Sequence, residues 1–232
     1  MALASAGVTA YQISLMQLFS YVQWYHFAYM VVSLALLGFG ASGTALTFAW
    51  SVFRRHAWVV IWGSLSLGAI AMPGAVHLLQ VDLFRFDLYL LFVEGSQLFR
   101  LLGAVFLLFL PFFFNALAIG GILTVNASGA SRFYGADLAG SGVGGLAGLA
   151  LATQLSPGMS AASCGIGAAL GAMLLLPRVR ARWAVAMSGL VAGVIAVGLC
   201  FPVTPRPSQF KDIGRVLAMP QAELLATEPG IA

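Results

Sequence analysis

Charged residues are scarce in this sequence. Asp, Glu, Lys and Arg together make up 8% of its 232 residues, whereas 61% are hydrophobic. A soluble domain carries about 25% charged residues, so this composition excludes an ordinary soluble globular protein. Several apolar stretches reach the length of about 20 residues that a helix needs to cross the hydrocarbon core of a bilayer. The sequence therefore predicts an all-α fold, a polytopic bundle of transmembrane helices.

Cysteine is scarce as well, and basic charge is not concentrated in any one segment. Cys164 and Cys200 both lie in apolar stretches, and no C-x-x-C motif occurs, so neither a zinc site nor a disulfide framework is indicated. The net charge is +4, but the arginines stand at the ends of apolar stretches, which is typical of a topology signal. We therefore expect the lipid bilayer and other membrane subunits as partners, and no nucleic acid.

The apolar stretches predict about seven spans. The first lacks the basic n-region of a signal peptide, so we expect it to be retained. It is also the weakest, because Tyr11, Gln12, Ser14 and Gln17 interrupt it, and without it six spans remain. The expected spans are residues 2–21, 24–50, 57–79, 98–125, 133–155, 159–176 and 183–201.

The connections add three expectations. Pro73 and Gly74 are expected to kink the third span. Residues 80–97 mix acidic and basic side chains with large apolar ones, which indicates an amphipathic helix or a structured loop at the membrane interface. Three prolines between positions 202 and 207 end the apolar part. We expect a transmembrane domain over 1–203 and an extramembrane tail over 204–232 that resembles the start of a soluble domain.

The arginines predict the orientation. If the N-terminus is cytoplasmic and seven spans follow, the basic connections face the cytoplasm, as the positive-inside rule requires. The tail then lies on the outer side of a bacterial inner membrane. If the first span does not cross, the tail moves to the cytoplasm. The arginines that decide this are Arg54, Arg55, Arg132, Arg178, Arg180 and Arg182.

A glycine-rich stretch raises the question of a cofactor. Residues 140–145, GSGVGG, match the dinucleotide-binding pattern G-x-G-x-x-G. That pattern works on a strand-to-helix turn with an acidic residue about 20 positions further on. Here the glycines lie inside an apolar segment, and the first acidic residue after Asp137 is Asp212. The sequence therefore does not support a dinucleotide site.

A second spacing explains these glycines better. Small residues recur every four positions along the same segment, which gives one helix face without bulky side chains. We expect this face to pack against another helix, with the span that follows Pro157 as its partner, in a tight hairpin. The residues expected at this contact are Ala136, Gly140, Gly144, Gly148, Ala152 and Gly165.

Ionisable and polar residues within apolar spans are the remaining candidates, because such residues are costly in a membrane. Asp137 and Asn115 are weak candidates for a substrate or ion, and the sequence favours a helix-terminal acid and a hydrogen-bonded amide between helices as their explanation. His26 and His77 are weak candidates for contact with a tetrapyrrole. No cofactor is predicted beyond this, and we expect no catalytic residue and no metal site.

Four stretches resemble the membrane-spanning part of bacterial spermidine-synthase-like fusion proteins, which join a multi-span region to an aminopropyltransferase- or methyltransferase-like domain. The matching stretches are residues 11–46, 110–120, 132–146 and 202–224. The resemblance implies a catalytic domain after the tail, and the sequence stops at Ala232 before any such domain. No catalytic residue can therefore be transferred to this chain.

The leading hypothesis is a non-catalytic integral membrane subunit, an accessory component or anchor of a larger complex. Respiratory and photosynthetic complexes are natural hosts, because they recruit small apolar subunits. Two alternatives stay open, a truncated membrane domain of a spermidine-synthase-like enzyme and a small-molecule transporter. Contacts with an adjacent protein are expected at Phe106, Phe109, Phe112 and Phe113.

Overall fold

The computed structural model describes residues 1–22, 27–81, 84, 86, 90–179, 182–201 and 219. Within these residues the chain is helical, without a β-strand, and the predicted all-α bundle is confirmed. A short 3-10 helix, η2 (Ala127–Gly129), precedes α5. The α-helices are α1 (Ala2–Val22), α2 (Phe27–Phe48), α3 (Trp50–Leu78), α4 (Gly95–Val125), α5 (Ala130–Gln154), α6 (Pro157–Ser163), α7 (Gly165–Val179) and α8 (Arg182–Cys200).

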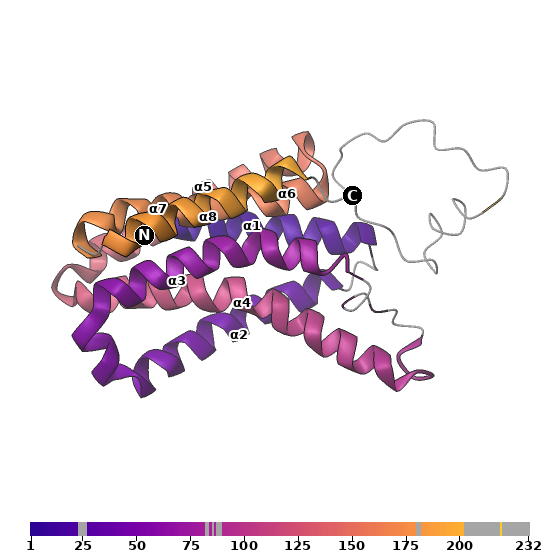
Figure 1. Ribbon diagram of the computed structural model, residues 1–232, viewed down its shortest axis with the longest axis horizontal. Helices are drawn as coiled ribbons and strands as arrows, with labels where there is room; N and C mark the ends of the chain where they lie inside the picture. The colour runs from indigo at the N-terminus through magenta and orange to yellow at the C-terminus, as the bar shows by residue number, and fades with distance from the viewer. Residues whose placement is uncertain are drawn as a thin grey trace.

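Successive helices run up and down the bundle, with α6 and α7 together forming one pass. Figure 1 shows α5, α7 and α8 along one side, α2 and α4 along the other, and α1 and α3 between them. Six segments are long and apolar enough to cross a membrane, and α1 is not among them. The protein is thus a multi-pass membrane protein by length and composition, with α1 as an additional helix inside it.

Helix α1 lies inside the bundle, and this position permits its polar residues. It contacts α2, α4, α5, α6 and α7, and half of its residues are buried. Tyr11 and Ser14 are fully enclosed, and Gln17 is buried. A helix surrounded by protein can carry polar side chains because its neighbours supply their hydrogen bonds. The polar residues that interrupt the first predicted span therefore mark an interior helix.

The largest apolar cluster joins α1 to α2, α3, α4 and α6. At its centre the rings of Tyr11 and Phe112 lie 5.6 Å apart, and both side chains have no exposed surface. The expectation that Phe112 contacts an adjacent protein is therefore wrong. Phe106, six residues earlier on α4, is 59% exposed.

Several predicted boundaries differ from the structure. Helix α3 begins at Trp50 and includes the arginine pair expected in a loop. Its non-helical backbone angles occur at His56, rather than at Pro73 where the kink was expected. The span after Pro157 is interrupted at Cys164, between α6 and α7. In the connection 80–97, residues 82, 83, 85 and 87–89 lie outside the described residues, and residues 95–97 belong to α4. Nearly all of the tail 204–232 also lies outside the described residues.

The small-residue face of α5 lies against α1. A methyl group placed on Gly144 would lie 2.6 Å from the Cα atom of Ala6, and one on Gly140 would lie 2.7 Å from the Cα atom of Ala2. Gly148 approaches α1 in the same way. Because the nearest atoms are backbone, only glycine permits this approach. Ala152 is buried on the same face, and Ala136 is half-buried.

The predicted partner of this face was wrong. We expected α5 to pair with the span after Pro157, but its extensive contact is with α1. Alanines at positions 2, 6 and 10 give α1 a matching face with the same four-residue spacing. Gly165 of α7 faces α3, where an added methyl group would lie 2.6 Å from the carbonyl oxygen of Ala69. The short turn before Pro157 therefore does not make α5 and the span that follows it the closest packing partners.

Candidate functional site

Three polar side chains in the middle and second half of α1 bond to three different helices. The Tyr11 hydroxyl donates to the carbonyl oxygen of Met72 on α3 at 3.4 Å. Ser14 and Ser160, on α6, share a hydrogen bond of 2.7 Å between their hydroxyl groups. The Gln17 amide donates to the carbonyl oxygen of Ala152 on α5 at 3.0 Å. This set of contacts fixes the rotation and the height of α1 within the bundle.

Asp137 is part of the same system. The Ser5 hydroxyl of α1 donates to its carboxylate, so Asp137 joins α5 to α1 near the N-terminal ends of both helices. Burial lowers the pKa of the Met1 amino group, and the nearby Asp137 carboxylate acts in the opposite direction. Asp137 is half-buried. Asp137 therefore serves as a contact between α5 and α1.

Asn115 lies in a different seam, between α4 and α3. Its side chain has no exposed surface, and its amide nitrogen donates to the carbonyl oxygen of Pro111 at 2.9 Å. The amide fills the space that the missing side chain of Gly68 leaves. Its Oδ1 atom has no hydrogen-bond partner among the described residues. Asn115 and Asp137 therefore belong to separate helix contacts, and the structure does not bring them together along one path.

His77 connects the end of α3 to the end of α8. Its Nδ1 lies 2.9 Å from the carbonyl oxygen of Pro73, and its Nε2 lies 3.0 Å from that of Phe201. In this position both ring nitrogens face backbone carbonyls, so neither is directed at an open site where a tetrapyrrole metal could approach. His26 lies outside the described residues.

The cysteines occupy different environments. Cys164 is buried, and its thiol donates to the Ser160 carbonyl oxygen at 3.2 Å and lies 3.8 Å from the Ser14 hydroxyl. Cys200 is exposed at the end of α8. Among the described residues there is no cluster of three or more His, Cys, Asp or Glu side chains that could hold a metal.

The sequence did not single out three buried polar atoms on α3 and α8. Trp62 and Ser66 lie one turn apart on α3, and Ser188 lies on α8. Their side-chain polar atoms are buried without a hydrogen-bond partner in the described part of the chain. The rings of Trp62 and Trp183 pack edge to face at 5.3 Å and join α3 to α8. Serines at single positions in apolar segments gave no signal that would have singled them out.

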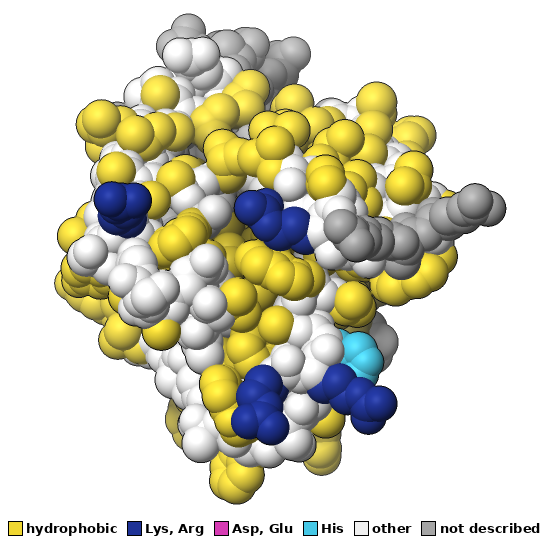
Figure 2. Space-filling view, turned by 90° about the vertical axis from the view of Figure 1, so that its left-hand side faces the viewer, with side chains coloured by type: hydrophobic (Ala, Val, Ile, Leu, Met, Phe, Trp, Pro, Cys, Tyr) yellow, Lys and Arg dark blue, Asp and Glu magenta, His cyan; other side chains and the backbone are white. Residues whose placement is uncertain are grey.

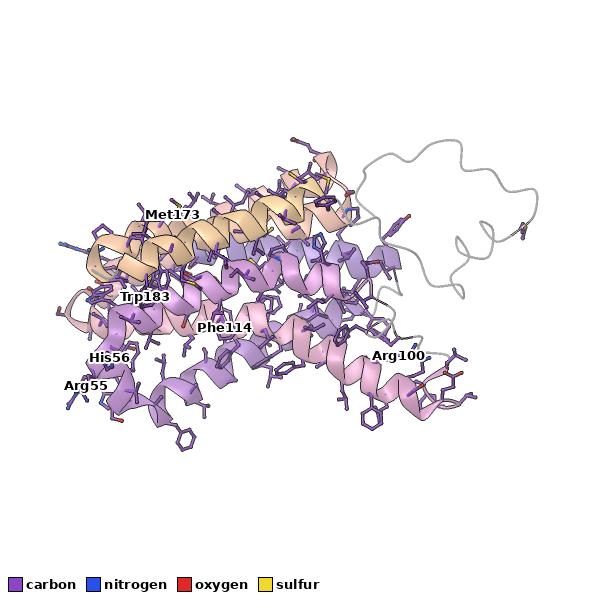
Figure 3. The ribbon with its side chains drawn as sticks, in the orientation of Figure 1. Arg55, His56, Arg100, Phe114, Met173 and Trp183 are labelled. Carbon is purple, nitrogen blue, oxygen red and sulfur yellow. The ribbon has the colours of Figure 1, made fainter. Side chains whose placement is uncertain are left out.

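The charged side chains are separated along the bundle axis. Figure 3 shows Arg55 and His56 at one end and Arg100 near the opposite end of the bundle. The first of these ends, the arginine end, carries four exposed arginines, because Arg178 packs on Trp58 near the start of α3 and Phe133, next to Arg132, lines the same pocket as both. The four are Arg54, Arg55, Arg132 and Arg178. Viewed onto this end in Figure 2, basic side chains surround an apolar surface, and no acidic side chain is seen among the described residues.

The G-x-G-x-x-G stretch lies wholly inside helix α5. It therefore lacks the strand-to-helix turn that a dinucleotide phosphate needs. Its Gly140 and Gly144 are covered by α1, whereas a methyl group placed on Gly142 or Gly145 would meet no atom of another helix within 4 Å. The alternation of covered and open glycines follows from the helical period.

Fold and site together define a multi-pass α-helical membrane protein whose interior polar groups chiefly join helices. Comparison with protein-family models found no match, and comparisons with curated proteins and with solved structures found none either.

Proposed function

We propose that this chain is a non-catalytic integral membrane subunit that serves as an accessory component or anchor of a larger complex in a bacterial inner membrane. The interior supports this role, because its polar side chains are used to hold helices together. A subunit of this kind also needs an outer surface that another transmembrane helix can approach closely.

Helix α8 offers such a surface, and this observation carries the proposal. Its outward face bears small residues that are all exposed, Ala186, Gly189, Gly193 and Ala196. No atom lies within 4 Å of a methyl group placed on Gly189 or Gly193. In a membrane, helices associate by close packing of small residues, as α5 and α1 do here. The face of α5 is covered by α1, whereas the face of α8 is open.

The arginine end is the proposed cytoplasmic end. Four exposed arginines of the described chain gather there, and positive residues favour the cytoplasmic side. The first residue of α1 lies at the same end, and α8 ends at the opposite one, beside His77. Because α1 runs alongside α5 from Gly140 to Ala152, it passes through the bundle together with the six apolar segments. The end of α8 therefore lies at the end that we propose to be the outer one.

The test is purification from native membranes in mild detergent, followed by native mass analysis and identification of co-purifying chains. We expect a discrete assembly with at least one other membrane protein. The variant Gly189→Leu/Gly193→Leu should release that partner, because leucine side chains hold the helices apart. The matched control is Gly142→Leu, an exposed glycine with a leucine four residues away on either side.

Recovery of the chain alone, in wild type and variants alike, would overturn the proposal. Recovery of a longer chain that carries an aminopropyltransferase-like domain would instead favour the membrane domain of a spermidine-synthase-like enzyme. Loss of the partner in both the α8 variant and the Gly142 control would show that α8 is not the contact.

A further inference from the structure

A pocket of about 230 Å³ opens at the arginine end of the bundle. Its walls come from the start of α1, from α3, from the end of α4, from the start of α5 and from the last turns of α7. The lining is mainly apolar, with Trp58, Leu65, Ile122, Phe133 and Leu174 among its residues. Five helices thus converge on a cavity that none of them fills.

One arginine stands at the pocket, and Met1, whose amino group lies near the Asp137 carboxylate, also lines it. The guanidinium carbon of Arg178 lies 5.1 Å from the centre of the Trp58 ring, a distance typical of a cation–π contact. The Arg178 side chain is exposed, so its polar nitrogens remain available to a ligand while the ring holds their position. Asn126 adds a polar side chain at the end of α4. The pocket therefore combines an apolar interior with a fixed positive group.

We propose that this pocket binds an anionic phospholipid, with the phosphate group at Arg178 and part of an acyl chain in the apolar interior. Basic pockets between transmembrane helices are sites for anionic lipid head groups. Sites that enclose a whole drug-sized ligand measure about 300–1,000 Å³, so this pocket is too small for an entire lipid. A smaller pocket with an exposed mouth suits one segment of a lipid chain whose remainder lies in the bilayer.

The charge around the pocket supports an anionic head group over a zwitterionic one. Arg54, Arg55 and Arg132 are exposed at the same end, and among described residues no acidic side chain lines the pocket. A free phosphate would use Arg178 but would leave the apolar walls without a ligand. The inference does not rest on the proposed assembly, since it concerns the isolated chain.

The experiment is native mass spectrometry of the purified full chain, titrated with dioleoylphosphatidylglycerol or dioleoylphosphatidylcholine. We expect the wild type to bind the anionic lipid more tightly. Arg178→Gln should weaken that preference by about fivefold, which corresponds to about 1 kcal/mol for one arginine near a membrane surface. Arg100→Gln, near the opposite end of the bundle, should leave the preference unchanged.

A second pair of variants tests the apolar part. Gly171 lines the pocket, and a methyl group on it would make an ordinary contact of 3.6 Å with Leu65. Gly171→Leu should fill the space and lower the affinity for both lipids, whereas Gly145→Leu, at an open position on α5, should lower neither. If Gly171→Leu does not fold, the two arginine variants still decide the question.

Three results would overturn the inference. They are equal affinity of the wild type for the two lipids, an unchanged preference in Arg178→Gln, and displacement of the bound lipid by millimolar inorganic phosphate. The last result would identify a simple anion site that makes no use of the apolar walls.

Discussion

The close approach of α5 to α1 predicts that Gly144→Ala will destabilise the bundle, whereas Gly145→Ala will not. In Gly144→Ala the new methyl carbon would lie 2.6 Å from the Cα atom of Ala6, and contacts shorter than 3.4 Å are already tighter than nine in ten real ones. The helices must therefore separate by at least about 0.8 Å, the difference between these two distances, because the carbonyl oxygen of Ala6 lies closer still. In Gly145→Ala the methyl group meets no atom within 4 Å.

The cost follows from which atoms are in the way. Overpacking costs about 1–3 kcal/mol when side chains can adjust. Here the obstacle is the backbone of α1, so the separation extends to the neighbouring close approaches at Gly140 and Gly148. We expect a cost of about 3 kcal/mol, the upper end of that range. At about 2–4 °C per kcal/mol for a chain of this size, Tm falls by about 6–12 °C.

The assay is thermal unfolding of the two purified variants in the same detergent, followed by the loss of the monodisperse peak in size-exclusion chromatography. Gly145→Ala should match the wild type or exceed it slightly, because alanine favours a helix over glycine by up to about 1 kcal/mol. Equal Tm values for the two variants would refute the reasoning, since it depends on the contrast between a covered and an open glycine.

Two further predictions concern hydrogen bonds and thiols. A double-mutant cycle on Ser14→Ala and Ser160→Ala should give a coupling free energy of about 0.6 kcal/mol, the average for hydrogen bonds between membrane helices. Unfolding in SDS measures this coupling. Strictly additive effects of the two substitutions would contradict the 2.7 Å contact between the hydroxyl groups. A membrane-impermeant maleimide should label exposed Cys200 from the outer side of intact cells, while buried Cys164 reacts only after denaturation. Labelling of Cys200 only in inverted vesicles would reverse the proposed orientation.

The sequence by itself determined the class of protein. Low charge and long apolar segments leave transmembrane helices as the structure that can satisfy the backbone in lipid, so fold class and most spans followed from composition and length. The four-residue spacing of small residues likewise identified the face of α5 that approaches another helix. It did so because a helix repeats its faces at a fixed period, whatever surrounds it.

Only the tertiary structure decided which surfaces meet. The spacing in α5 is compatible with any neighbour that has a small-residue face, and α1, far away in sequence, fits it where the adjacent span does not. The same holds for Phe112, whose burial depends on Tyr11 from another helix. The pocket beside Arg178 is formed by residues of five helices. Such features depend on how helices distant in sequence pack together, and a local pattern does not encode that arrangement.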